Sequence, residues 1–575
     1  MRGPFLAMLE FRRRLLQPES PALQDDGTFS GDPKLTLRHT LVSYFESFGK
    51  KPACHHDLAS YFVTPLLELD GGGTLPGPEI VEQVLSDMKQ SIVKEVSLRD
   101  ALDCADAQSR TLAAYQVYVT QVKVWKLLEF LAQSSGTTIE EDYRRCAALI
   151  RRAEKLQPLE RFREDPREYL LGDELWMLAA LYLVSAFRKD QTNPIPLMQA
   201  VAILERAQAV STNYFQFRLL LIRLYSMLGA INSSHHMYWC SGDVKGLLRE
   251  SLGYLLLPDL HKYAALPQLQ QHFDKLDKFQ DQHTKDTPEV GFFPFQHGSY
   301  SKVVEMSRFA YQLEMSGQRI QAQLDKPLVG LYEQMQTPGQ AVDFLEQCMD
   351  VKLTQRLMEE EEISRLLQDV KQNFDLQVME TYDGDGPSSV RHILLPVKEL
   401  VPSAESLVSK LRLKACVQVC LLHALRGLSS LKSTPKDHGG GASSSSPASA
   451  SPKEQLRATL TCLKSAVQAA SLEGAESQQW QCSVLLFDIC DALLHVDEVE
   501  SPASLSELQS QLSHLETLWA DLLPEHSKVL DQWMVESPSA AISFTDAISK
   551  RLPSLSTLLC NHLVWLTLLL PLING

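Results

Sequence analysis

The chain has 575 residues, with 71 acidic against 55 basic side chains and a formal net charge of -16. Its 44% hydrophobic content is that of a folded chain, and its length predicts several domains or one extended repeat array. The acidic total argues against a protein that coats nucleic acid, because such a protein needs an overall surplus of Lys and Arg, but it leaves room for a local basic patch.

The first element with a distinctive charge pattern is a predicted helix over residues 144–155. Residues at i, i+1, i+7 and i+8 are basic, so the same face is positive again two turns later. Cations in such a row suit RNA phosphates, which predicts a ribosome or RNA contact. The alternative is an ordinary solvated helix face whose other side is apolar. The basic residues are Arg144, Arg145, Arg151, Arg152 and Lys155.

Three consecutive helices are predicted over residues 175–228. Apolar residues at i, i+3, i+4, i+7, i+8 and i+11 from Leu175 define the first helix, and Asn193-Pro194 ends it. A second helix covers 197–207. The third covers 214–228 and ends at Gly229, a residue type suited to a left-handed C-terminal cap. No alternating β-branched runs separate these helices, which predicts an all-α fold.

Two short stretches are similar in register to tetratricopeptide repeats, in which paired helices recur with a 34-residue period. Neither match is complete, and generic helix packing would also place glycine and tyrosine at such offsets. We nevertheless predict an α-solenoid of degenerate tetratricopeptide-like helix pairs, because many helix pairs in one chain need a way to stack. The register residues are Leu221, Tyr225 and Gly229 in one stretch and Gly298, Tyr300 and Ala310 in the other.

A possible metal site falls in a later helix. Cys416, Cys420 and His423 stand at i, i+4 and i+7, so one helix face carries three candidate ligands. Cysteine is also among the most buried residue types and packs as a small hydrophobe. We therefore favour core packing, and we predict no metal site.

One segment of the sequence cannot form a core. Residues 433–453 contain a run of three glycines and a run of four serines, which predicts a flexible linker. A weaker boundary lies near 382–387, where Gly, Asp and Pro cluster. We predict a tetratricopeptide-like α-solenoid at 1–380, a helical extension at 381–432, the linker at 433–453 and a C-terminal helical segment at 454–575.

The last 24 residues, 552–575, carry no formal charge. Their dense apolar run is about half of the roughly 20 residues that span a bilayer, so a packed helix is favoured over a tail anchor, and we expect no membrane contact. The 11 cysteines include no CxxC pair, which argues against a disulfide framework or a zinc ribbon. A reducing, cytoplasmic location fits this pattern.

Enzyme motifs are missing from the sequence. There is no GxxxxGK phosphate loop, no GxGxxG after a strand, no HExxH and no GxSxG. We predict a non-catalytic protein with no bound cofactor.

Three stretches carry a resemblance to a known family, the large auxiliary subunits of the NatB N-terminal acetyltransferase complex. The first combines 2–10 with 31–33 and 44–54, the second combines 217–230 with 243–245 and 253–256, and the third is 298–303. The similarity is clear over about residues 1–325.

The resemblance implies a non-catalytic α-solenoid that wraps a small catalytic subunit, which binds acetyl-CoA, and holds it at the ribosome. That complex acetylates nascent chains that begin Met-Asp, Met-Glu, Met-Asn or Met-Gln. Family members extend upstream of the point that matches Arg2 and carry a lysine-rich run near their C-terminus, and this chain has neither, so it resembles a shortened member. The competing hypothesis is a general helical-repeat adaptor that binds peptides and is unconnected with acetylation. DNA is not expected as a partner.

Overall fold

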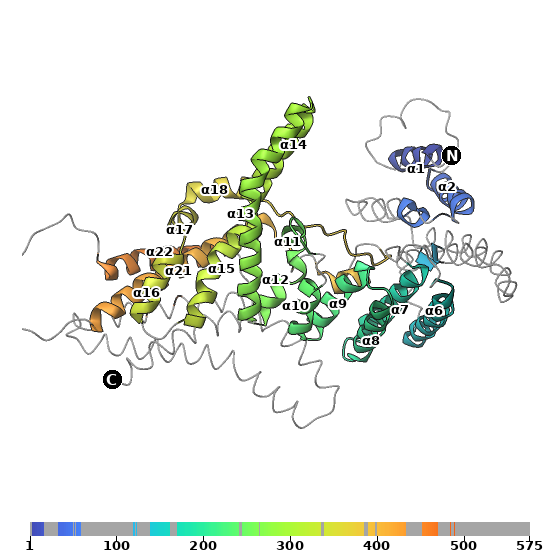
Figure 1. Cartoon of the computed structure of the whole chain (residues 1–575), viewed down its shortest axis with the longest axis horizontal. Coiled ribbons are helices and arrows are strands. Elements are labelled where there is room, and N and C mark those ends of the chain that lie inside the picture. The colour runs from blue at the N-terminus through green and yellow to red at the C-terminus, as the bar shows by residue number, and fades with distance from the viewer. Residues whose placement is uncertain are drawn as a thin grey trace, which may run out of the picture. The chain divides into compact units, whose positions relative to one another are not determined.

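The computed structural model shows helices throughout the residues that it describes (Figure 1). In this part of the chain the single β-type contact is an isolated bridge between Ser316 and Lys371. The all-α prediction is therefore confirmed. The described residues are 3–15, 33–49, 51, 53–58, 119–120, 122–123, 138–160, 170–240, 244–263, 265–334, 338–383, 389–396, 400–432, 451–469, 484 and 488.

The chain forms two compact units. Unit 1 consists of Met1–Leu228 with Gln377–Pro396, and unit 2 consists of Gly229–Leu376 with Val397–Gly575. The domain boundaries expected from the sequence stay a prediction, because residues 433–450 of the expected linker and most of 454–575 lie outside the described residues.

Unit 1 contains a row of helices that pack in chain order, α6 on α7, α7 on α8 and α8 on α9. Packing of each helix on its sequence neighbours is the arrangement of an α-solenoid. The helices expected over 175–228 are confirmed as α7 to α9. The unit 1 helices are α1 (Gly3–Leu15), α2 (Pro33–Phe48), α6 (Ile139–Glu160), α7 (Leu171–Lys189), α8 (Ile195–Val210), α9 (Phe215–Met227) and α19 (Val390–Leu394).

Hydrogen bonding and backbone conformation explain where α8 begins and where α9 ends. The Asn193 side chain accepts a hydrogen bond from the backbone N–H of Ile195 at 3.0 Å, which satisfies a donor at the start of α8. After α9, Gly229 adopts a φ of 74°, the left-handed conformation that glycine reaches at no steric cost. The expected glycine cap is therefore present.

The segment 377–396 returns to unit 1 from far along the chain. The Gln216 side chain donates to the carbonyl of Val378 at 2.7 Å, and buried Arg223 donates to the carbonyl of Leu394 at 2.8 Å. Both donors lie on α9 and are buried, so water cannot easily replace these hydrogen bonds. They hold the segment 377–396 against α9.

Unit 2 is organised around α21, the long helix that contacts α15, α16, α17, α18 and α22. Its buried face joins two apolar clusters, one with α16 and α22 and one with α17 and α18. The unit 2 helices are α10 (Ile231–Cys240), α11 (Leu248–Ser251), the 3-10 helix η4 (Gly253–Leu255), α12 (Leu257–Lys262), α13 (Leu266–Gln296), α14 (Tyr300–Glu314), α15 (Gly317–Gln334), α16 (Pro338–Cys348), α17 (Val351–Met358), α18 (Glu360–Asp369), α21 (Ala404–Lys432) and α22 (Pro452–Ala469).

No helix in the described ranges is both long and apolar enough to cross a membrane. The uncharged stretch at 552–575, for which a packed helix was favoured over a tail anchor, lies outside those ranges.

Candidate interaction surfaces

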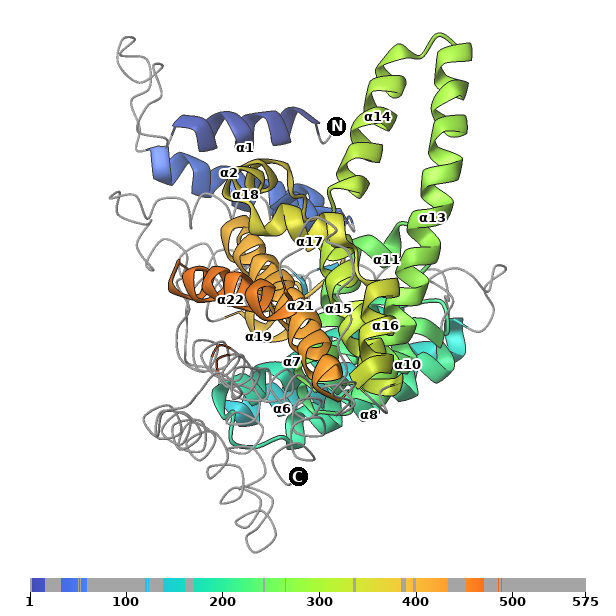
Figure 2. The ribbon, with the colours of Figure 1, turned by 90° about the vertical axis from the view of Figure 1, so that its left-hand side faces the viewer.

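A strongly exposed apolar surface of unit 2 lies on the hairpin formed by α13 and α14, which pack together and run side by side in Figure 2. Gly298 lies in the connection with a φ of 70°, and the N–H of Ser299 donates to the carbonyl of Pro294 at 2.8 Å. A left-handed residue lets the chain reverse within a few positions, and glycine adopts this conformation without strain. The sequence therefore fixes a sharp turn between two long helices.

The two ends of α13 have different environments. Leu269, Phe273 and Leu276 are buried near its start. Near its end and across the turn, four aromatic side chains are 55 to 64% exposed. These four form the aromatic tip: Phe292, Phe293, Phe295 and Tyr300.

Three of the four rings in the aromatic tip lie close together. The ring of Phe295 is centred 6.3 Å from that of Phe292 and 6.0 Å from that of Tyr300. Val290 and Val304 extend the exposed apolar surface along the hairpin. Clustered apolar surface of this kind marks protein interaction sites, and aromatic residues are enriched at the centre of such interfaces.

The basic residues of α6 lie partly as the sequence predicts. Arg144, Arg151 and Lys155 are exposed in a line along the helix, and we call these three the basic stripe. Arg145 and Arg152 are half-buried, because they are turned about 100° from the line. Arg145 also lies over the ring of Tyr182 at 5.7 Å, so part of its surface is committed to packing on α7.

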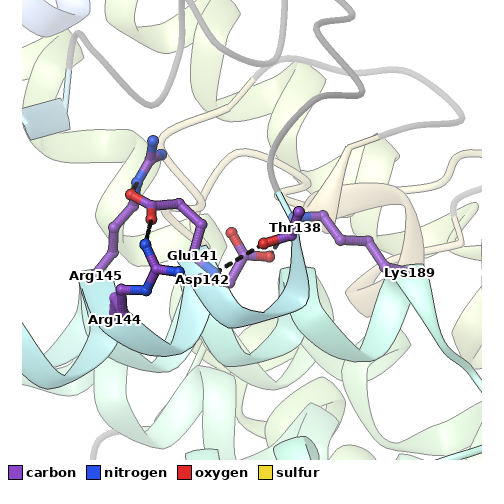
Figure 3. A network of polar contacts seen from close by, with 6 residues as sticks. All are labelled: Thr138, Glu141, Asp142, Arg144, Arg145 and Lys189. Carbon is purple, nitrogen blue, oxygen red and sulfur yellow. Dashed lines mark hydrogen bonds and ion pairs between the residues drawn. The ribbon is translucent and has the colours of Figure 1, made fainter.

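The start of α6 neutralises one end of the basic stripe (Figure 3). Glu141 accepts hydrogen bonds from Arg144 at 3.0 Å and from Arg145 at 3.2 Å. The buried carboxylate of Asp142 accepts one from Lys189 at 2.5 Å, which ties α6 to α7. Acidic residues in the first turn also suit the positive end of the helix dipole.

The far end of the basic stripe carries cations that form no ion pair. Within the described part of the chain, neither Arg151 nor Lys155 is paired, and the nearby Glu154 pairs with Arg206 at 2.8 Å. Exposed cations outside ion pairs are available to a phosphate backbone. Contact with RNA stays a prediction.

The repeat-register residues have contrasting environments. Leu221 and Tyr225 are buried on α9, whereas Tyr300 is exposed in the aromatic tip and Ala310 is half-buried on α14. Tyr225 and Tyr300 therefore do not share a packing role. The tetratricopeptide register stays a prediction.

The cysteines of α21 belong to the core. Cys416 and Cys420 are fully buried in the cluster formed with α16 and α22, as the core interpretation predicts. His423 is half-buried on the same helix, and burial lowers the pKa of its imidazole. No group of three His, Cys, Asp or Glu side chains suited to a metal ion occurs among the described residues.

Unit 2 also contains a cavity of about 290 Å³ between α12, α15 and α21. Buried Asp325 lies in its wall and accepts two hydrogen bonds from Lys414, at 2.6 and 2.7 Å. His261 lies 3.3 Å from the same carboxylate. Burial lowers the pKa of His261 to about 4, so at neutral pH the imidazole is uncharged and Lys414 alone balances Asp325.

Comparison with known proteins identifies the family. A family model described as the non-catalytic subunit of the N-acetyltransferase B complex (NatB) matches residues 1–374. The chain belongs to this family. The matched residues include the basic stripe and the α13–α14 hairpin, while α21 and α22 lie beyond them.

Curated members of the NatB family are related over part of their length. The chain is 24% identical over 332 residues to the NatB complex auxiliary subunit NAA25 of Arabidopsis thaliana, covering 58% of this chain and 27% of that protein. It is 26% identical over 410 residues to the NatB auxiliary subunit N-alpha-acetyltransferase 25 of Homo sapiens, covering 69% of this chain and 37% of that protein. The chain thus spans about a third of the length of these relatives.

Among solved structures, a chain of the NatB acetyltransferase complex bound to a bisubstrate inhibitor is similar with a TM-score of 0.39 at 12% identity. The similarity covers 97% of this chain and 72% of that one. The resemblance to NatB auxiliary subunits seen in the sequence is confirmed by the family match, and with it the prediction that the chain is non-catalytic.

The aromatic tip was not among the sites predicted from the sequence. Its signal is a run of three phenylalanines within four positions, interrupted by Pro294 and followed by Gly298. Large aromatics close to a turn are candidates for exposure, because a hairpin end has no helix beyond it to cover them.

Proposed function

We propose that this chain is a scaffold subunit of a NatB complex that binds a small catalytic acetyltransferase. Membership of the non-catalytic family carries the proposal. The partner would bind acetyl-CoA and acetylate nascent chains that begin Met-Asp, Met-Glu, Met-Asn or Met-Gln, in the cytoplasm. The aromatic tip supports this role, since the described part of unit 2 offers the partner a clustered apolar surface there.

Affinity purification of the tagged chain from its own cells tests the scaffold role. We expect a small acetyltransferase to co-purify in about equal amount, and the eluate to acetylate a Met-Asp peptide when acetyl-CoA is supplied. The chain alone should show no such activity. Recovery of varied peptides or peptide-bearing proteins, with no acetyltransferase among them, would instead support the helical-repeat adaptor.

We further propose that the basic stripe holds this complex on ribosomal RNA. The support is the exposed line of Arg144, Arg151 and Lys155, two members of which form no ion pair within the described residues. A local patch of this kind is compatible with a net charge of -16, because screening limits the influence of distant acidic residues to about 8 Å at physiological salt.

Replacing the three residues of the basic stripe by glutamine should weaken ribosome binding. Each lost phosphate contact reduces the slope of log K against log salt by roughly 0.7 to 0.9, so the triple variant should lower the slope by about 2. Co-sedimentation with ribosomes across a salt series measures this change. A matched variant removes three exposed cations of unit 2, Lys278, Lys352 and Arg365.

The control variant should bind ribosomes like the parent chain. Equal slopes for the parent and the stripe variant would reject the ribosomal role of α6. Equal losses in the stripe and control variants would indicate a general effect of charge instead.

A further inference from the structure

Two cysteines from different helices of unit 2 lie side by side. The sulfur of Cys416 on α21 is 3.8 Å from the sulfur of Cys462 on α22. Cys416 is fully buried, whereas Cys462 is half-buried at the edge of the same apolar cluster. A disulfide needs about 2.05 Å between sulfurs, so the two cysteines are free thiols whose sulfurs lie in contact.

A positive charge lies beside this pair. Arg412 is one turn before Cys416 on α21, and its guanidinium donates to Glu360 at 2.5 Å. Its side chain is 12% exposed, and its Nε has no hydrogen-bond partner within the described residues. The bond to Glu360 holds the guanidinium, and its charge acts on the Cys462 sulfur in favour of the thiolate.

The two thiols are not equivalent. A hydrogen bond from the Cys416 thiol, and then the charge of Arg412, lower the pKa of Cys462, although burial and the charge of Glu360 oppose them. The same hydrogen bond and burial raise the pKa of Cys416. Cys462 is also the more accessible sulfur, which makes it the one to meet an oxidant, with Cys416 placed to attack next.

We propose that Cys416 and Cys462 form a reversible oxidation site whose substrate is a small hydroperoxide. The Cys462 thiolate attacks one oxygen of hydrogen peroxide, the O–O bond breaks, and a sulfenic acid and hydroxide result. The Cys416 sulfur loses its proton and attacks the sulfenic sulfur, expelling the second oxygen as hydroxide. With protons returned from the thiols, the sum is two thiols and one peroxide giving one disulfide and two waters.

The disulfide would join α21 to α22 covalently. These helices pack closely, and α22 supplies Leu456, Leu460 and Leu463 to the shared cluster. In a reducing compartment such a bond forms only transiently, so oxidation would fix α22 on α21 for as long as peroxide persists. This site lies outside residues 1–374, which match the NatB family.

The experiment uses the full chain, reduced and then exposed to a small excess of hydrogen peroxide. Free thiols are blocked with N-ethylmaleimide, and peptides are analysed by mass spectrometry without reduction. We expect a cross-linked peptide pair containing Cys416 and Cys462 that dithiothreitol separates. A Cys416→Ser variant should accumulate sulfenic acid on Cys462, captured by dimedone, and a Cys462→Ser variant should form no cross-link.

Two further variants test the role of the Arg412 charge and the selectivity of the oxidation. Arg412→Gln leaves both sulfurs in place and should slow oxidation roughly tenfold, because the thiolate loses its cation. Cys348→Ser is the control, since Cys348 is exposed on α16 with no described cysteine within hydrogen-bonding distance. Cross-linking that is unchanged in rate by Arg412→Gln, or Cys348 reacting before Cys462, would overturn the proposal.

Discussion

A chain in which Phe292 and Phe293 are both replaced by serine is expected to bind the proposed catalytic partner much more weakly. Both side chains are more than half exposed, so their truncation should change the free energy of unfolding by no more than about 0.5 kcal/mol. Aromatic anchors buried at an interface contribute roughly 1.5 kcal/mol each, and 1.4 kcal/mol is a factor of ten in affinity. Together the two substitutions should weaken the complex by about 100-fold.

Quantitative pull-down of the tagged variant measures this loss. The control replaces Ile195 and Met198 by serine, since these apolar side chains of α8 are exposed to a similar degree. The control should retain the partner, and thermal unfolding of both variants should match the parent. A tip variant that still recovers a full amount of acetyltransferase would exclude the hairpin from the interface and leave the scaffold role intact.

Much of the helical fold was predictable because its signal is local. The helical spacing that begins at Leu175 predicted α7, although the structure buries every residue from Leu175 to Val184 rather than one face, and the end of α9 is encoded by Gly229. The aromatic tip was not predictable in this way. The residues Phe292, Phe293 and Phe295 are of a type usually found inside proteins, and only the length of α13 beyond its buried start leaves them exposed.

The candidate sites also differ in how far the sequence predicts them: local helical spacing predicts the basic stripe, but not the cysteine pair. Helical spacing correctly placed Arg144, Arg151 and Lys155 on one exposed line, although it did not separate them from half-buried Arg145 and Arg152. The pairing of Cys416 with Cys462 depends on which helices pack together, and an expected linker separates the two in sequence. The spacing of residues within one helix predicts which of them share a helix face. Contacts between side chains of different helices can be identified only once the packing of those helices is known.

Removing one partner of the buried Asp325–Lys414 ion pair in unit 2 is expected to lower the free energy of unfolding substantially. Asp325 is 5% exposed and its carboxylate is held by Lys414 from α21, while His261 is uncharged at neutral pH. Asp325→Leu would therefore leave the Lys414 ammonium without its counter-charge beside an apolar core. Breaking a buried pair from one side costs about 3 to 5 kcal/mol. We expect the lower end, about 3 kcal/mol, because the Lys414 side chain keeps 19% of its surface exposed.

A double-mutant cycle separates the ion pair from packing. In the parent chain, burial holds the pKa of His261 at about 4, so stability is lost as pH falls below 6.5, where the unfolded chain takes up this proton more readily. Lys414→Met removes one of the charges that lower this pKa, so that loss should be smaller in the variant, and the substitution should cost less at pH 6 than at pH 8. The double variant should regain about 2 kcal/mol relative to the sum of the singles, since a buried pair replaced by apolar side chains is often neutral.

Urea unfolding of the four proteins at pH 6 and pH 8 provides the measurement. Asp277→Leu is the matched control, because Asp277 pairs with neighbouring Lys326 at 2.6 Å while both side chains stay more than a third exposed. Exposed pairs contribute at most about 1 kcal/mol. If Asp325→Leu destabilises the chain no more than Asp277→Leu does, then Lys414 reaches water once Asp325 is removed, and the core of unit 2 does not depend on this pair.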